Sequence, residues 1–338
     1  MQNRYSGDIE DYSKFILIKR LFGNKSVGVV WYLYPDETHN NDGKHKDYHK
    51  YSKLNDLELI SVLENVANTK RDIKNLETKL KEYFENQKIK YFGDFIEDGF
   101  KKKTEKREKW IKRAVDSIKN CSVVFVDPDN GIEVKSVKKS NKKGGKYIFF
   151  DEIEKFFENS EILVVYQHFP RIKQDLFIKN RLNEIREKIK GDYYLYAIKF
   201  KPISPRVYFV FVKSNKKDEF EKGLKNFMNS PYSKGYEIFK EYKIQNLCFY
   251  AKDDEVIKKA FEYMEELSKT DPFGFSFYLK LNNKMITNKT LLENKKIEND
   301  KFYLLVLGKN ADIEVTDKIN NYLMVFDEGK NSYIYEVI

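Results

Sequence analysis

Cysteine, glycine and proline are scarce in this chain of 338 residues, and their scarcity excludes several classes of protein. There are two cysteines, Cys121 and Cys248, which lie far apart and match no ligand spacing. This excludes a disulfide scaffold and favours a reducing compartment or ordinary core sulfur. Only 15 Gly and 7 Pro stand against 24 Tyr and 26 Phe. So many aromatic residues exclude a disordered chain and predict a globular protein with a sizeable core.

Long hydrophobic runs are also missing. No apolar stretch approaches the roughly 18 residues that a membrane-spanning helix needs. The first residues, "MQNRYSGDIED", lack the basic and apolar regions of a signal peptide. We therefore expect a cytoplasmic protein without a membrane partner.

Positive charge is present in excess, but it is local. The net charge is +10, and residues 101–146 hold 15 Lys and Arg against 6 Asp and Glu. A helix-spaced basic segment and the loop "KSVKKSNKKGGK" carry this surplus, which predicts a nucleic-acid partner, RNA or DNA. The alternative is a solvated helix face with a flexible lysine-rich loop. The candidate nucleic-acid-binding residues are Lys138, Lys139, Lys142, Lys143 and Arg171.

Strand and helix patterns alternate over the first two thirds of the chain. "SVGVVWYL" and "CSVVFVDPDNG" read as strands buried on both faces, and helix patterns precede and follow them. The series ends in an antiparallel pair, so we predict an α/β doubly wound sheet with a reversed last strand in residues 1–243. Residues 244–338 read as a small α+β domain with an acidic balance. This domain is expected to make a protein contact or a dimer, or to act as a passive cap.

Unusual polar stretches follow three of the predicted strands: "YPDETHNNDGKH", "DPDNG" and "YQHFPR". Ligands of doubly wound sheets bind at the carboxyl ends of the strands. All four histidines of the chain lie in or just after these stretches: His39, His45, His49 and His168. The sequence therefore predicts a functional cleft at this edge of the sheet.

Three short motifs resemble the ribosomal RNA adenine-N6 methyltransferases, whose S-adenosylmethionine-binding fold is Rossmann-like. "GDIEDYSKF" is similar to their opening segment at Gly7, Asp11 and Lys14, "ETHNNDG" to the loop after their first strand, and "FVDPDNGIE" to their catalytic D-P-P-Y. The resemblance implies a methyltransferase-like sheet and methyl transfer to a base amino group of RNA or DNA. It implies catalytic roles for Asp127, Pro128, Asp129 and Asn130, and His168 in "YQHFPR" is a further catalytic candidate at the same edge of the sheet. The resemblance also implies cofactor contacts from Lys14, Glu37, Thr38, His39, Asn40, Asn41, Asp42 and Gly43.

The chain departs from that family at two functional positions. Asn40, Asn41 and Asp42 stand where small residues would let the cofactor approach, and Asp129 and Asn130 replace the second proline and the aromatic of D-P-P-Y. A second and closer resemblance, to a bacterial family with "GD..DY.K", "HNNDG.H", "DPDNG" and "YQH..R", implies no function. "DPDNG" by itself is also consistent with a plain turn.

Two other functions stay open. A metal-dependent nuclease would use Asp129, Glu133 and Lys135, although a hairpin turn at Asn130 and Gly131 would place these side chains on different faces. A divalent metal could also be held by His39, Asp42, His45 and His49, a weak signal because the H-E-x-x-H glutamate is missing. The other function is a non-catalytic binding module for nucleic acid or protein that retains an enzyme-derived fold.

Overall fold

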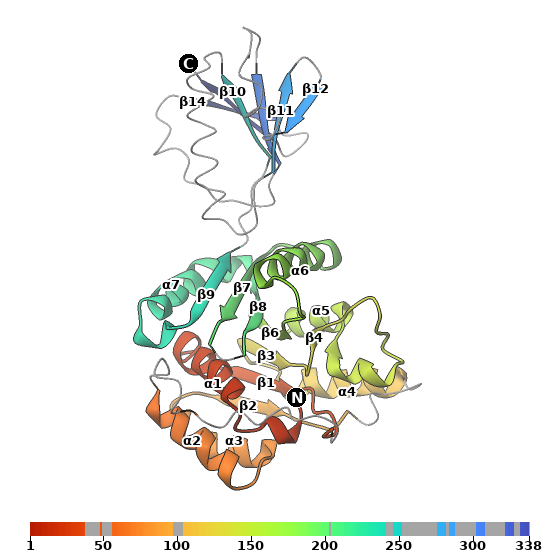
Figure 1. The fold of residues 1–338 in the computed structure, drawn as a ribbon, viewed down its shortest axis with the longest axis vertical. Coiled ribbons are helices and arrows are strands. Elements are labelled where there is room, and N and C mark those ends of the chain that lie inside the picture. Colours follow the sequence, from red (N-terminus) through yellow and green to blue (C-terminus); the bar gives the residue numbers. More distant parts are fainter. Residues whose placement is uncertain are drawn as a thin grey trace. The chain divides into compact units, whose positions relative to one another are not determined.

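The computed structural model describes residues 1–37, 48, 56–96, 104–202 and 204–240, together with the backbone of six C-terminal strands. The chain forms two compact units, Met1–Ile238 and Phe239–Ile338. The first unit carries the site, and Figure 1 shows its sheet with helices packed around it.

A mostly parallel sheet of seven strands is the centre of the first unit. Its strand order is β2-β1-β3-β6-β8-β7-β9, and β1 pairs in parallel with β2 and β3, as does β3 with β6. β8 runs antiparallel to both β6 and β7. The bounds are β1 Val27–Trp31, β2 Ile89–Phe92, β3 Val123–Asp127, β6 Ile162–His168, β7 Tyr193–Phe200, β8 Arg206–Lys213 and β9 Tyr236–Lys240.

Seven α-helices are described beside this sheet. They are α1 Ile9–Ile16, α2 Leu57–Asn68, α3 Ile73–Tyr83, α4 Thr104–Ser117, α5 Phe150–Glu158, α6 Gln174–Lys188 and α7 Lys217–Met228. A π-helical turn, Leu17–Leu21, extends α1. The short helical turns are Asn3–Tyr5, Lys142–Lys146, Ser214–Lys216 and Pro231–Ser233.

Helices cover both faces of the sheet. Val27, Val29 and Trp31 of β1 belong to one core cluster with buried side chains of α1, α2, α3 and α7. Gly28 faces the other side, where a Cβ would lie 2.7 Å from Ile118 Cβ just after α4. Because alternate residues of a strand point to opposite faces, β1 is buried on both. The α/β class is confirmed, and the arrangement is compatible with a Rossmann-like fold.

The reversed strand is not the last one. β8 is the antiparallel strand that the sequence predicted, but β9 follows it in the chain and is paired at the edge beside β7. The predicted hairpin at Asn130 and Gly131 is wrong. After β3 the chain forms the short strand β4, Gly131–Ile132, which pairs in parallel with β5, Tyr147–Ile148.

The second unit contains a six-stranded sheet of order β12-β11-β13-β10-β15-β14. β10 and β15 are parallel, whereas the pairs β10–β13, β11–β12, β11–β13 and β14–β15 are antiparallel. The bounds are β10 Asn246–Ala251, β11 Ser276–Leu281, β12 Lys284–Thr287, β13 Phe302–Leu307, β14 Tyr322–Asp327 and β15 Ser332–Val337. The helical part of the α+β domain predicted for residues 244–338 lies outside the described residues.

Candidate functional site

Lys14 lies at the centre of a charged cluster at the carboxyl end of β3. Its ammonium donates to Asp127 Oδ2 at 2.9 Å and to Asp11 Oδ1 at 3.0 Å, and all three residues are buried. Asp11 and Lys14 are three residues apart on α1, which places them on one face of the helix. Asp127 is the last residue of β3. The structure therefore joins the first and third sequence motifs through a buried Asp-Lys-Asp ion network.

Aromatic rings enclose the Lys14 ammonium. It lies 5.8 Å from the ring centroid of Trp31, at the end of β1, and 5.4 Å from that of Tyr166 on β6. Both rings are buried, and a cation over an aromatic face is attracted by the ring quadrupole. Three neighbouring strands, β1, β3 and β6, thus converge on one lysine.

A second group of charges lies beside the first and is partly open to solvent. Lys146 approaches Glu37 Oε2 at 2.6 Å and Asp129 Oδ2 at 3.2 Å, and Gln2 Nε2 donates to the same Asp129 oxygen at 3.0 Å. The Met1 amino group lies 3.6 Å from Asp129 Oδ1 and donates to the carbonyl oxygen of Tyr32 at 2.9 Å. The first two residues of the chain therefore pack against "DPDNG". Together with Asp11, Lys14 and Asp127, these residues form what we call the strand-end cluster: Gln2, Asp11, Lys14, Glu37, Asp127, Asp129 and Lys146.

The electrostatics favour the charged forms of both lysines. Burial opposes a charge on Lys14, but Asp127 and Asp11 outweigh it and raise its pKa well above the ordinary value. Burial likewise opposes the charge on Lys146, and Asp129 and Glu37 raise its pKa. The pKa of Asp129 is lowered because the Met1 amino group and Lys146 outweigh its burial. Neither lysine is therefore suited to act as a general base near neutral pH.

"DPDNG" is a fixed connection from β3 into β4. Gly131 has φ +106°, and a Cβ there would lie 2.4 Å from Gln167 Cδ. The Gln167 amide accepts from Ile132 N at 2.9 Å and donates to the Asn130 carbonyl at 2.9 Å. Glycine is thus required here by both its backbone conformation and the close approach of Gln167.

The remaining predicted catalytic residues do not complete an acceptor site around Asp127. Pro128 is buried, Asn130 is half-buried, and its backbone N–H donates to the Lys146 carbonyl at 2.9 Å. His168 ends β6 with an exposed side chain, and its register partner across the sheet is Arg206. Asp127 itself is 1% exposed. A base amino group could reach its carboxylate only after movement of the residues that cover it.

The acids of the nuclease alternative have other tasks. Glu133 Oε1 accepts from the backbone N–H of Phe150 at 2.9 Å, at the first turn of α5, and Lys135 lies on the surface. Within residues 1–37, 56–96 and 104–240, no group of three or more His, Cys, Asp or Glu could hold a metal ion. The predicted ligands His39, Asp42, His45 and His49 lie outside the described residues, as do Thr38, Asn40, Asn41 and Gly43 of the predicted cofactor loop.

Two glycines and the carboxylates at the described strand ends face other parts of the protein. Gly7, at φ +72°, faces protein rather than open space, since a Cβ there would lie 2.7 Å from the Leu63 carbonyl oxygen. Gly131 is closed by Gln167, and the carboxylates of Asp11, Asp127 and Asp129 are already paired with lysines or with Gln2. Glu37 is paired with Lys146. Gly7, Gly131 and the carboxylates of the strand-end cluster are therefore engaged within the chain.

A buried arginine holds the basic loop onto the same unit. Arg107 on α4 pairs through Nε and Nη2 with the two Glu152 oxygens at 2.5 and 2.9 Å. It also donates to the carbonyls of Gly144 at 2.8 Å and Tyr147 at 2.7 Å. Arg107 was counted with the basic surface in the sequence, but it is 2% exposed and belongs to the core.

The predicted nucleic-acid-binding lysines lie at the surface. Lys138, Lys142, Lys143 and Arg171 are exposed, and Lys139 is half-buried, with an ion pair to Asp151. The loop that carries the lysines ends at Lys146, whose ammonium belongs to the strand-end cluster. In Figure 1 this loop lies on the same side of the unit as α4 and α5.

Sequence reasoning missed Gln2, Asp11, Lys146 and Gln167 as residues that build the site. Two of them had a direct signal: Asp11 lies in the first motif, three residues before Lys14, and Lys146 is the last residue of "KSVKKSNKKGGK". Gln167 lies in a stretch already singled out for its polarity. Gln2 had no signal, because nothing in "MQN" distinguishes it from a polar terminus.

No protein-family model matches the chain, and no curated protein matches it. Among the described helices, none is both long and apolar enough to cross a membrane. Function is therefore inferred from the contacts and charges of the described residues.

Proposed function

We propose that this protein binds nucleic acid, and that it does so with the basic loop of residues 135–146 next to the strand-end cluster. One observation carries the proposal. The exposed lysines of the loop and the charged cluster at the sheet edge are joined through Lys146, which is 2.6 Å from Glu37 and 3.2 Å from Asp129. A phosphate backbone on the loop would therefore run past the carboxyl ends of β1 and β3, where ligands of such sheets bind.

The cluster gives the binding surface a fixed position. Lys14 and Lys146 each bridge two carboxylates, and Arg107 fixes the loop through Gly144 and Tyr147. Buried ion networks are costly to form, and removing one partner is strongly destabilising. A rigid support lowers the ordering cost that a flexible loop would otherwise pay on binding.

A second candidate is methyl transfer to a base amino group by a methyltransferase-like sheet. Two features favour it: β8 is reversed within an otherwise mostly parallel sheet, and Asp127 and Pro128 directly follow a central strand. The closed environment of Asp127 favours the non-catalytic candidate instead. Six of the eight predicted cofactor contacts, residues 38–43, lie outside the described residues.

Two measurements test these candidates. Fluorescence anisotropy of labelled RNA and DNA, single-stranded and duplex, over a range of salt should show log affinity falling linearly with log salt. No binding to any of the four probes at low salt would refute nucleic-acid binding. A thermal shift with S-adenosylmethionine, compared with ATP as a control for adenosine recognition, would support methyl transfer. If saturating S-adenosylmethionine causes no thermal shift, methyl transfer is refuted and the non-catalytic nucleic-acid-binding module remains.

A further inference from the structure

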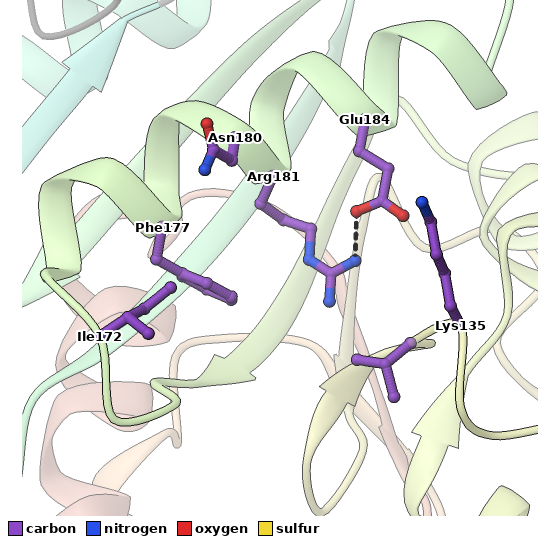
Figure 2. Close-up of a pocket in the computed structure, with 7 residues that line it drawn as sticks. Lys135, Ile172, Phe177, Asn180, Arg181 and Glu184 are labelled. Carbon is purple, nitrogen blue, oxygen red and sulfur yellow. Dashed lines mark hydrogen bonds and ion pairs between the residues drawn. The ribbon is translucent and has the colours of Figure 1, made fainter.

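A pocket between α6 and the segment after β4 lies apart from the strand-end cluster (Figure 2). Its volume is about 240 Å³. Pockets for drug-sized ligands measure about 300–1,000 Å³, so this one suits a single small ring rather than a whole cofactor. It is lined by Val134, Lys135, Ile172, Phe177, Asn180, Arg181 and Glu184.

The pocket combines an apolar wall with a fixed planar cation. Phe177 and Ile172 form the wall, and Arg181 lies between Phe177 and Glu184 in Figure 2. The Arg181 guanidinium is 5.6 Å from the Phe177 ring centroid and donates to the backbone carbonyls of Glu133 at 3.1 Å and Ile132 at 3.3 Å. Aromatic rings and arginine planes are the surfaces on which nucleobases stack.

One carboxylate gives the pocket a hydrogen-bonding preference. Glu184 is half-buried and accepts from Arg181 Nη1 at 2.6 Å. A carboxylate oxygen has further lone pairs, so it can also accept from an amino group of a ligand. Cytosine, adenine and guanine each carry an exocyclic amino group that can donate to Glu184. Uracil and thymine have no amino group and carry carbonyl oxygens, which only accept.

Cations border the pocket on two sides. Lys135 lines it from the segment after β4, three residues before Lys138 of the basic loop. Arg171 and Lys173 are exposed and flank Ile172 before α6. The charge around the pocket is therefore complementary to a phosphodiester backbone, while its interior is suited to an uncharged ring.

We propose that this pocket holds one unpaired, amino-bearing base of a single-stranded nucleic acid whose backbone follows the basic loop. The inference rests on the proposed nucleic-acid binding and adds a substrate class to it. In a duplex the bases are stacked and paired, so entry of a base requires a single strand or an extruded nucleotide.

Oligo-deoxycytidine and oligo-deoxyuridine of equal length are the sharpest probes, because their bases have the same ring and differ only at C4, an amino group against a carbonyl, and at N3, an acceptor against an N–H donor. Anisotropy titrations should show tighter binding of oligo-deoxycytidine by the wild-type protein. Ile172→Ser should weaken that binding about tenfold. The matched control is Leu176→Ser: Leu176 is 51% exposed and Ile172 52%, both near the start of α6, but Leu176 does not line the pocket. Duplex binding should be unchanged in both variants.

Glu184→Gln is a second variant. Its amide oxygen can still accept from Arg181, but its NH2 group replaces the second carboxylate oxygen with a donor. It should reduce the preference for oligo-deoxycytidine over oligo-deoxyuridine. If Ile172→Ser binds like Leu176→Ser, or if wild-type protein does not distinguish the two oligomers, the inference is overturned. Salt-dependent binding that persists in that case leaves the proposed function standing. Absence of binding to both oligomers also overturns the inference, whereas the proposed function is refuted only if the RNA and duplex probes are not bound either.

Discussion

The strand-end cluster and the basic loop are both rich in charge, but they use it differently. In the cluster, Lys14 and Lys146 each bridge two carboxylates within the chain. The loop carries exposed lysines at positions Lys138, Lys142 and Lys143. The buried ion pair that supports the loop is formed by Arg107 and Glu152. A high density of charged residues in a sequence therefore does not by itself locate a binding surface. Substitutions in the cluster should change stability, and substitutions in the loop should change binding.

The largest effect is expected from Lys14→Met. This change leaves Asp11 and Asp127 buried without their shared cation, and breaking a buried ion network in this way costs about 3–5 kcal/mol. Urea denaturation followed by tryptophan fluorescence would measure the loss. Asp127→Asn in the same background should restore part of it, because one of the two stranded charges disappears. A loss below about 0.5 kcal/mol would show that the network does not support the fold.

Arg107→Lys should have an intermediate effect. Lysine keeps the charge but cannot pair bidentately with Glu152 while also donating to Gly144 and Tyr147. We expect a loss of about 1–2 kcal/mol in the free energy of unfolding, with faster hydrogen exchange in residues 135–147. Lys109→Met on the exposed face of α4 is the control and should stay within about 0.5 kcal/mol of wild type. Equal effects of the two substitutions would contradict the separation of core and surface charge.

A smaller effect is expected from Asp8→Asn, and it should depend on pH. Burial, with a contribution from Glu10, raises the pKa of Asp8 from 3.8 to about 6. The folded state then holds a proton that the unfolded state has lost between these values, so the wild-type protein loses stability as the pH rises from about 4 to 6. Asparagine carries no charge and caps helices as well as aspartate does, which suits the Asp8 position before α1.

The asparagine variant should therefore be about 1 kcal/mol more stable than wild type at pH 7 and no more stable at pH 4. Thermal melts of both proteins at the two pH values would measure this. If the two proteins differ in stability by the same amount at both pH values, the effect comes from the helix cap and not from the raised pKa of Asp8.

Much of the fold could be predicted from the sequence. "SVGVVWYL" and "CSVVFVDPDNG" are apolar on successive residues, and the structure buries them on both faces as parallel strands. The π-helical turn after α1, the β4–β5 pair and β9 could not be predicted, because their bounds depend on tertiary partners such as Gln167 rather than on local periodicity.

The candidate site was predictable in its place but not in its chemistry. The polar ends of the strands predicted that these side chains would gather at one edge of the sheet, and Lys14, Glu37, Asp127 and Asp129 do meet there. Asp127 is paired with Lys14 rather than open to a ligand. This pairing depends on how α1 packs against β3, because the two residues are 113 positions apart in the sequence. No short motif contains that information.

The salt dependence of nucleic-acid binding by a loop variant tests the central claim most directly. Lys138, Lys142 and Lys143 would be replaced by Gln, and a matched variant would lose three exposed lysines of α3, Lys74, Lys79 and Lys81. Each phosphate contact contributes about 0.9 to the slope of log affinity against log salt on duplex DNA. The loop variant should show a clearly flatter slope with unchanged thermal stability, and the α3 variant should keep the wild-type slope. Equal slopes in both variants would contradict the assignment of the basic loop as the nucleic-acid-binding surface.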